Sequence, residues 1–61
     1  MKEYLGKLCN ITINRNGKEL FYEANVNGVS DIHISFKDRY GKQYTFKKED
    51  CVEISEVERK G

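Results

Sequence analysis

Hydrophobic and polar residues alternate along most of this chain. Residues 8–14, 31–37 and 43–47 place an apolar side chain at every second position, and residues 20–29 do the same over a longer run. Such alternation is typical of a β-strand with one buried face. The inward-facing residues that it predicts are Cys9, Ile11, Ile13, Leu20, Tyr22, Ala24, Val26, Ile32, Ile34, Phe36, Tyr44 and Phe46.

Turn signals separate these segments. Asn16-Gly17 predicts a tight hairpin turn, because both residues tolerate a positive φ. Asn27-Gly28 predicts a further turn or a bulge, and Gly41 supplies a permissive conformation between the third and fourth strands.

The C-terminal part of the chain is less periodic. Residues 47–51 predict a short turn, and residues 51–57 predict a last short strand with Val52 and Ile54 facing inward. A helix over residues 47–59 is the only competing interpretation, since no segment sustains a helical period over ten residues.

Five short strands with regular turns predict an all-β barrel or sandwich. We expect a single domain over residues 1–61, with an ordered core at about 5–56 and a frayed C-terminal tail. One flat sheet of this length cannot cover its own apolar face, whereas a small barrel covers that face and removes most free edges.

The composition narrows the class of protein. The 38% apolar residues are spread along the chain without a low-complexity tract, which favours a folded domain. No apolar run approaches the length of about 18 residues that indicates a membrane helix, and MKEYLGKLCN lacks the apolar stretch of a signal peptide. We therefore expect a cytoplasmic protein with no membrane contact.

Two cysteines and one histidine are too few ligands for a structural zinc site, so we expect no metal. Cys9 and Cys51 leave two alternatives open. They form a disulfide if the first and last strands lie side by side, or they are two buried thiols that act as small hydrophobic residues.

Charge is unevenly distributed along the chain. The net charge is +1, but residues 37–48 carry +4 and residues 49–61 carry −3. The chain is therefore polarised locally although it is nearly neutral as a whole.

These segments are similar to the pattern of SH3-like barrels, and of Tudor-type domains most of all. The resemblance covers residues 6–55 and rests on GKLCNI, FYEANVNGV and IHISFKDRYGKQYTFKKEDCVEI. It lies in a Gly before the first strand, an aromatic-x-Ala-x-Val second strand, a Tyr-Gly turn and a short acidic turn before the last strand. Small phage and bacterial SH3-like proteins look similar too. The resemblance implies a five-stranded SH3-like barrel.

Tudor domains bind methylated Lys or Arg in an aromatic cage. The resemblance would form this cage from Tyr22, Phe36 and Tyr40. The tryptophan that usually leads the cage falls near Asn14, and Lys42 replaces an asparagine and would repel a cationic ligand. We therefore do not predict binding of methylated Lys or Arg.

Catalytic patterns are missing from the sequence. His33 occupies an outward position of a strand, and Cys51 follows acidic residues that would raise the pKa of its thiol instead of activating it. No catalytic triad order and no phosphate-binding glycine loop is present. We expect no enzymatic activity and no cofactor.

Two binding functions remain. The first is a protein-binding adaptor or regulator of bacterial or phage type, because tyrosines at barrel rims combine apolar area with a polar tip. Its candidate contact residues are the aromatic residues Phe21, Tyr22, Tyr40 and Tyr44.

The alternative is binding of single-stranded RNA or DNA, in which cations pair with phosphates and tyrosines stack on bases. Its candidates are the basic residues of the third and fourth strands and the turn between them, Lys37, Arg39, Lys42, Lys47 and Lys48. We expect a monomer or a weak dimer, since a barrel this small leaves edge strands exposed.

Overall fold

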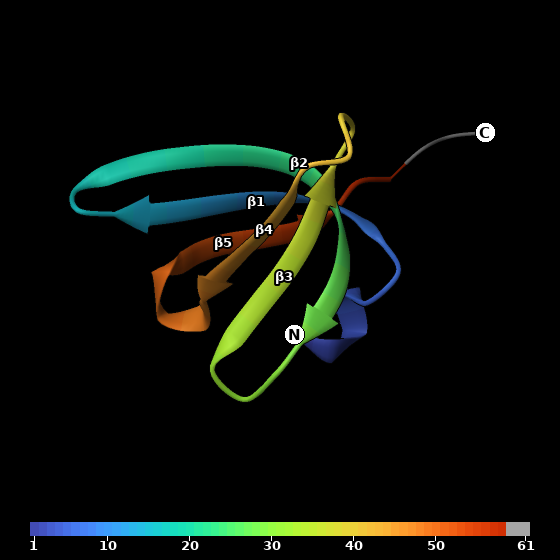
Figure 1. The fold of residues 1–61 in the computed structure, drawn as a ribbon, viewed down its shortest axis with the longest axis horizontal. Helices are drawn as coiled ribbons and strands as arrows, with labels where there is room; N and C mark the ends of the chain where they lie inside the picture. Colours follow the sequence, from blue (N-terminus) through green and yellow to red (C-terminus); the bar gives the residue numbers. More distant parts are fainter. Residues whose placement is uncertain (59–61) are drawn as a thin grey trace.

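A computed structural model describes residues 1–58 and shows one antiparallel sheet of five strands (Figure 1). The strands are β1 (Leu8–Arg15), β2 (Lys18–Val29), β3 (His33–Asp38), β4 (Gln43–Lys47) and β5 (Cys51–Glu56). Two single turns of 3-10 helix, η1 (Lys2–Tyr4) and η2 (Lys48–Asp50), are the helical segments of the described chain. The all-β prediction is confirmed, and the competing helix over 47–59 is not found in residues 47–58.

The β1–β2 hairpin has the predicted turn. Arg15 pairs with Lys18, and the two residues between them have positive φ angles, 54° at Asn16 and 77° at Gly17. Two positive φ angles define the turn type whose twist matches that of the flanking strands. The Asn-Gly signal is therefore confirmed.

β2 contains a bulge at the second Asn-Gly signal. Val26 pairs with Phe36 and Gly28 pairs with Ser35, so Asn27 is an extra residue on β2. A side chain at position 28 would have its Cβ 3.3 Å from the Cβ of Ser35, so glycine allows the close approach here. Figure 1 shows β2 running along β1 and then curving to meet β3. The bulge therefore bends the sheet, as bulges commonly do.

The sheet is not closed into a barrel. The strand order is β4-β3-β2-β1-β5, so β4 and β5 are its two edges, and no ladder joins them within residues 1–58. The bend in β2 brings the apolar faces of β3 and β4 against β1, so one core forms without edge-to-edge pairing. The expectation of a barrel that removes most free edges is wrong in this respect.

The core draws on four of the five strands. Its buried residues are Cys9, Ile11, Ile13, Ala24, Val26, Ile34, Phe36 and Phe46. Met1 and Tyr4 of the N-terminal segment pack against the core, and the Tyr4 hydroxyl donates to the Ile54 carbonyl at 3.4 Å. A segment with no predicted role thus covers one end of the sheet.

Two predicted core residues are exposed. Ile32 is 61% exposed because it lies in the bend before β3, where the Ser30 hydroxyl accepts the backbone N–H groups of Ile32 and His33. Val52 is 54% exposed because the β1–β5 register shifts there: Thr12 pairs with Glu53 while Ile13 pairs with Cys51. Val52 is therefore the unpaired residue of a bulge.

The two cysteines are free. β1 and β5 do lie side by side, but Cys9 pairs with Glu56 and Cys51 pairs with Ile13. The thiols are therefore about four residues apart along the ladder, beyond disulfide reach. Of the two alternatives, the free thiols are correct, and Cys51 is only half-buried.

The strand ladder continues one residue beyond β5. The Val57 N–H donates to the Leu8 carbonyl at 2.9 Å. The predicted frayed tail includes residues 59–61, which lie outside the described residues.

Candidate functional site

The turn between β3 and β4 presents one large aromatic side chain to solvent. We refer to residues 38–42 as the Tyr40 turn. One carboxylate oxygen of Asp38 accepts the backbone N–H groups of Tyr40 and Lys42, both at 2.9 Å. The Gly41 N–H donates to the Asp38 carbonyl at 3.0 Å, and φ of Gly41 is +82°. Tyr40 is 85% exposed on a turn that its own hydrogen bonds hold in place.

Four aromatic rings of β2, β3 and β4 form a cluster that includes Tyr44, the second residue of β4. The ring centroids of Tyr22 and Tyr44 are 4.8 Å apart, and Tyr22 lies 5.2 Å from Phe36. Phe46 completes the cluster at 5.8 Å from Phe36. Phe36 is fully buried, whereas Tyr22 and Tyr44 are half-buried. Two tyrosine rings therefore form the visible rim of the aromatic core.

A lysine lies over this rim. The Lys42 ammonium is 5.4 Å from the centroid of the Tyr44 ring, within the range of a cation–π contact. Loss of hydration raises the pKa of the Tyr22 and Tyr44 hydroxyls, and at Tyr22 the positive charge of Lys42 partly offsets this effect. Both tyrosines therefore remain neutral donors near neutral pH.

The four aromatic residues predicted to contact a partner do not lie on one surface. Tyr22 and Tyr44 lie together, and Tyr40 lies on the turn that leads into β4. Phe21 is 74% exposed but belongs to the opposite face of β2, because neighbouring side chains of a strand alternate. Phe21 is therefore not part of the surface around the Tyr40 turn.

The Tudor-type cage is not formed. Phe36, one of its three positions, has no exposed surface and packs inside the core. Asn14, at the place of the leading tryptophan, pairs with Glu19 beside the β1–β2 turn. The three positions Tyr22, Phe36 and Tyr40 therefore do not form an open cage in this structure.

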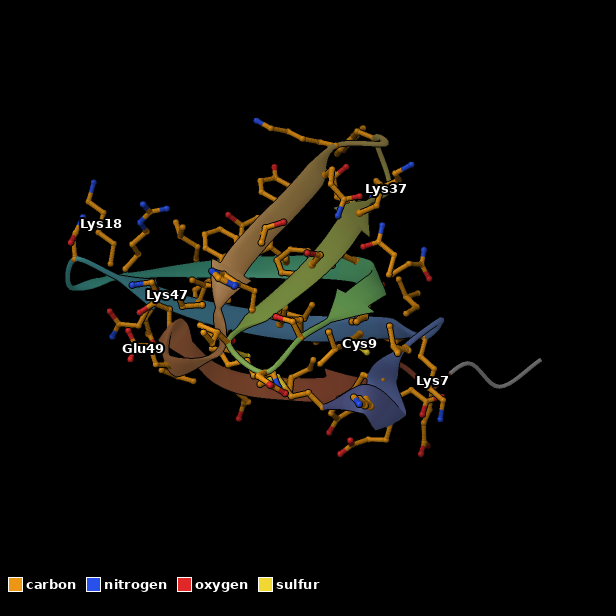
Figure 2. All side chains as sticks on the ribbon, turned by 60° about the horizontal axis from the view of Figure 1, so that its bottom comes forward. Lys7, Cys9, Lys18, Lys37, Lys47 and Glu49 are labelled. Carbon is orange, nitrogen blue, oxygen red and sulfur yellow. The ribbon has the colours of Figure 1, made fainter. Side chains whose placement is uncertain are left out.

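The five basic candidates do not share one surface. Arg39 lies 3.5 Å from the Glu23 carboxylate, and Lys42 covers Tyr44. Lys37 pairs with Gln43 and Lys47 pairs with His33, so the two lysines lie at opposite ends of the outer face of β3 and β4 (Figure 2). Lys48, the fifth candidate, is the first residue of η2. The sequence cluster of positive charge is therefore spread over both faces of the sheet.

His33 and the two cysteines are the residues that the sequence offered for catalysis or metal binding. His33 is exposed, and burial raises the pKa of the half-buried Cys51 thiol. Burial also raises the pKa of Cys9, with a further contribution from Glu56. No group of three His, Cys, Asp or Glu residues within 1–58 is arranged to hold a metal ion.

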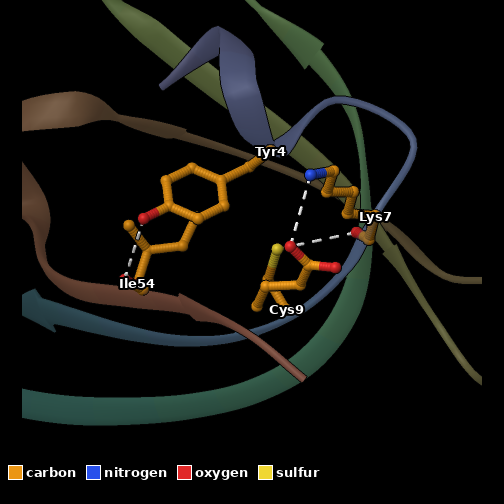
Figure 3. A network of polar contacts seen from close by, with 5 residues as sticks. Tyr4, Lys7, Cys9 and Ile54 are labelled. Atoms are coloured by element: carbon orange, nitrogen blue, oxygen red, sulfur yellow. Dashed lines mark hydrogen bonds and ion pairs between the residues drawn. The ribbon is translucent and has the colours of Figure 1, made fainter. Parts of the chain in front are cut away.

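The surroundings of Cys9 illustrate a structural network (Figure 3). The Lys7 ammonium and the Glu56 carboxylate are 3.3 Å apart, and the Cys9 thiol donates to the Lys7 carbonyl at 3.6 Å. These contacts join the segment before β1 to the end of β5. We therefore assign them to the attachment of the chain ends and not to a reactive site.

One feature of the site has no signal in the sequence. β4 begins directly after the Tyr40 turn. The backbone groups along one side of β4 have no strand partner, because β4 is an edge strand of the sheet. Alternating residues identify a strand but not its place in a sheet. A shallow hollow of about 660 Å³ on the outer face, lined by Leu8, Glu23, Asn25 and Arg39, was likewise not predicted.

None of the helical segments in the described part of the chain is long and apolar enough to cross a membrane. No protein-family model, curated protein or solved structure matches this chain. The five-stranded antiparallel sheet is compatible with a small barrel-like fold.

Proposed function

We propose that this chain is a small, non-enzymatic protein-binding module, an adaptor or regulator of bacterial or phage type. The observation that carries the proposal is the Tyr40 side chain, 85% exposed on a turn that Asp38 holds with two 2.9 Å hydrogen bonds. A large aromatic side chain on a preorganised backbone loses little entropy when it enters a partner's pocket.

The surroundings of Tyr40 support contact with a protein. Lys42 of the same turn offers a charge to acidic groups of a partner, and the half-buried rings of Tyr22 and Tyr44 lie below it. An exposed aromatic anchor next to apolar and charged contacts is the composition common at interaction hot spots.

The fold forms part of the same proposal. A four-strand meander, β1–β4, has a bulge in its second strand, and its first strand also pairs with β5. This topology supports an SH3-like arrangement that resembles Tudor-type domains. Fold likeness does not name a partner, so the proposal rests on the Tyr40 turn.

Capture from native bacterial lysate tests this function. Immobilised wild type, Tyr40→Ala and Val52→Ala are compared after nuclease treatment, and bound proteins are identified by mass spectrometry. Val52 is the matched control because it is exposed and apolar but lies on β5. We expect at least one protein to bind wild type and Val52→Ala and to be lost from Tyr40→Ala. Recovery of the same set by all three would remove Tyr40 as the contact.

Single-stranded nucleic acid is the second candidate. Lys42 above the Tyr44 ring places a cation next to a stacking surface, which is the arrangement that such binding uses. Arg39 is engaged by Glu23, however, and Lys37 lies far from Lys47 on the outer face, so few cations can track one backbone. Because these cations are spread apart, we rank nucleic-acid binding as the second candidate function.

The nucleic-acid alternative has its own test. If an oligonucleotide binds, the Lys47→Glu/Lys48→Glu double variant will bind it more weakly and with a flatter dependence on salt. Equal binding and an equal salt slope in wild type and double variant would exclude these two lysines as phosphate contacts.

A further inference from the structure

The hydrogen-bond register of β4 shows which of its backbone groups face away from the sheet. The Lys48 N–H donates to the Ile32 carbonyl at 2.7 Å, and the Asp38 N–H donates to the Lys42 carbonyl at 3.0 Å. In an antiparallel pair, bonded and non-bonded residue pairs alternate. Because these bonds fall at positions 42 and 48, the positions that bond to β3 are the even-numbered ones. The N–H and C=O groups of Gln43, Thr45 and Lys47 point away from β3.

This outward edge has no internal partner. In the sheet of residues 1–58, β4 pairs only with β3, and none of the backbone hydrogen bonds in turns and loops uses the N–H groups of Gln43, Thr45 or Lys47. All three residues are exposed. β4 contains no proline and pairs with β3 without a register shift. An unbroken row of free donors and acceptors is a template for one more strand.

The side chains along β4 indicate what kind of strand would fit. Tyr44 and Phe46 lie on the inner face, so a strand added at this edge would place alternate side chains beside the rim of the aromatic cluster. Its other side chains would lie beside Gln43, Thr45 and Lys47 on the outer face.

The charges at the edge favour an acidic occupant. On the outer face of β3 and β4 the charged side chains are Lys37 and Lys47, and no acidic residue of these two strands shares that face. Acidic groups lie beyond both ends of β4: Asp38 lies across from Lys42, and Glu49 and Asp50 follow β4 in η2. The outer face along β4 is therefore positive between these acidic residues. We propose that β4 binds an extended peptide segment in which apolar and acidic residues alternate.

A second copy of this chain fits the edge less well. Two β4 strands paired antiparallel about Thr45 would place Lys42 of each copy opposite Lys48 of the other. Like charges that face each other across strands are destabilising. A peptide partner with acidic side chains meets no such repulsion.

The inference rests on the proposed protein-binding function and specifies one of its contacts. The direct probe is a labelled seven-residue peptide, acetyl-Asp-Val-Asp-Ile-Glu-Val-Asp-amide, compared with the same peptide carrying Lys at every acidic position. Fluorescence anisotropy measures affinity, and amide hydrogen exchange by NMR locates the contact. We expect only the acidic peptide to bind and to slow exchange at Gln43, Thr45 and Lys47.

A matched pair of variants tests the strand edge itself. Thr45→Pro removes one outward N–H without removing a bond to β3, and proline is tolerated at such edge positions. Thr45→Val retains that N–H, and both variants lose the hydroxyl contact to Ser35 at 2.9 Å. We expect Thr45→Pro to weaken binding by about tenfold or more and Thr45→Val to change it by about twofold or less.

Several results would overturn the inference. Equal affinity of the acidic and basic peptides, no binding of either, or equal binding by Thr45→Pro and Thr45→Val would each do so. If Thr45→Pro fails to fold, the two peptides and the exchange pattern of Thr45→Val decide the question. Self-association of wild type at rising concentration, with β4 amides protected in the absence of peptide, would show that a second copy occupies the edge.

The proposed function fails separately from this inference. A partner lost from Tyr40→Ala, together with no peptide binding at β4, leaves the protein-binding function intact and rejects the edge. Peptide binding at β4, with no protein that depends on Tyr40, rejects the role of Tyr40 and supports the edge.

Discussion

The strength of the Tyr40 turn can be measured by removing the Asp38 carboxylate. In Asp38→Ala, the backbone N–H groups of Tyr40 and Lys42 lose the oxygen that accepts both at 2.9 Å. A hydrogen bond contributes about 0.5–1.5 kcal/mol to stability, and the exposed position of these donors lets water replace part of that. We therefore expect a loss of about 1–2 kcal/mol in the free energy of unfolding.

Thermal unfolding followed by circular dichroism measures this loss. In a domain of this size about 1 kcal/mol corresponds to roughly 4–8 °C in Tm, so we expect Asp38→Ala to unfold at least about 4 °C below wild type. Amide exchange at Tyr40 and Lys42 should accelerate more than exchange in the core strands, because the turn opens locally. Asp38→Asn keeps an acceptor oxygen and should recover most of the difference.

Two results would refute this reasoning. An unchanged Tm in Asp38→Ala would show that the two contacts add nothing to stability. Unchanged exchange at Tyr40 and Lys42 would show that the turn is held by its backbone alone, and the preorganisation of Tyr40 would then not depend on the carboxylate.

The core and the thiols give further predictions. Phe36→Ala should cost about 3–5 kcal/mol in urea unfolding because Phe36 is fully buried, while Val52→Ala should change stability by less than about 0.5 kcal/mol; similar effects would contradict the assignment of Val52 to a bulge. Burial raises the pKa of the Cys9 thiol above its ordinary value of 9.0. The neutral thiol therefore contributes fully to the free energy of unfolding below pH 9.0, and this contribution is lost as the pH rises through the raised pKa. Cys9→Ala should flatten the decline in stability between pH 8 and 11, and an unchanged slope would contradict this linkage.

Alternation along the chain predicted most of the sheet and its inner face. It placed Ile11, Ile34 and Phe36 in the core, and the two Asn-Gly pairs marked a hairpin turn and a bulge. These features are local, because a strand's period and a turn's φ angles depend on neighbouring residues.

The features that were missed depend on pairing between distant segments. Val52 keeps the alternation in sequence but loses it in the structure, since a register shift against β1 inserts it as an extra residue. The open sheet has a similar cause. The bend in β2 buries the apolar faces, so β4 and β5 need not pair. The alternation within a single strand predicts neither the register shift nor the open sheet.

The candidate site was predicted in part. Gly41 was expected in a permissive turn conformation, and its positive φ confirms this. The ion pair between Arg39 and Glu23 and the position of Lys42 over Tyr44 were not predicted, because they depend on how β2, β3 and β4 are arranged in space. Charge counted along the sequence therefore overstated the basic surface, because it ignored the face on which each side chain lies.

The central claim is that the ligand of this chain is a protein segment and not a nucleic acid. One NMR measurement tests it most directly: amide shifts of the labelled protein during parallel titrations with the acidic peptide and with single-stranded DNA and RNA, at low and physiological salt. We expect peptide-dependent shifts in residues 40–47 and no nucleic-acid shifts at physiological salt. Shifts in residues 37–48 with oligonucleotide at both salt concentrations, and none with the peptide, would contradict it.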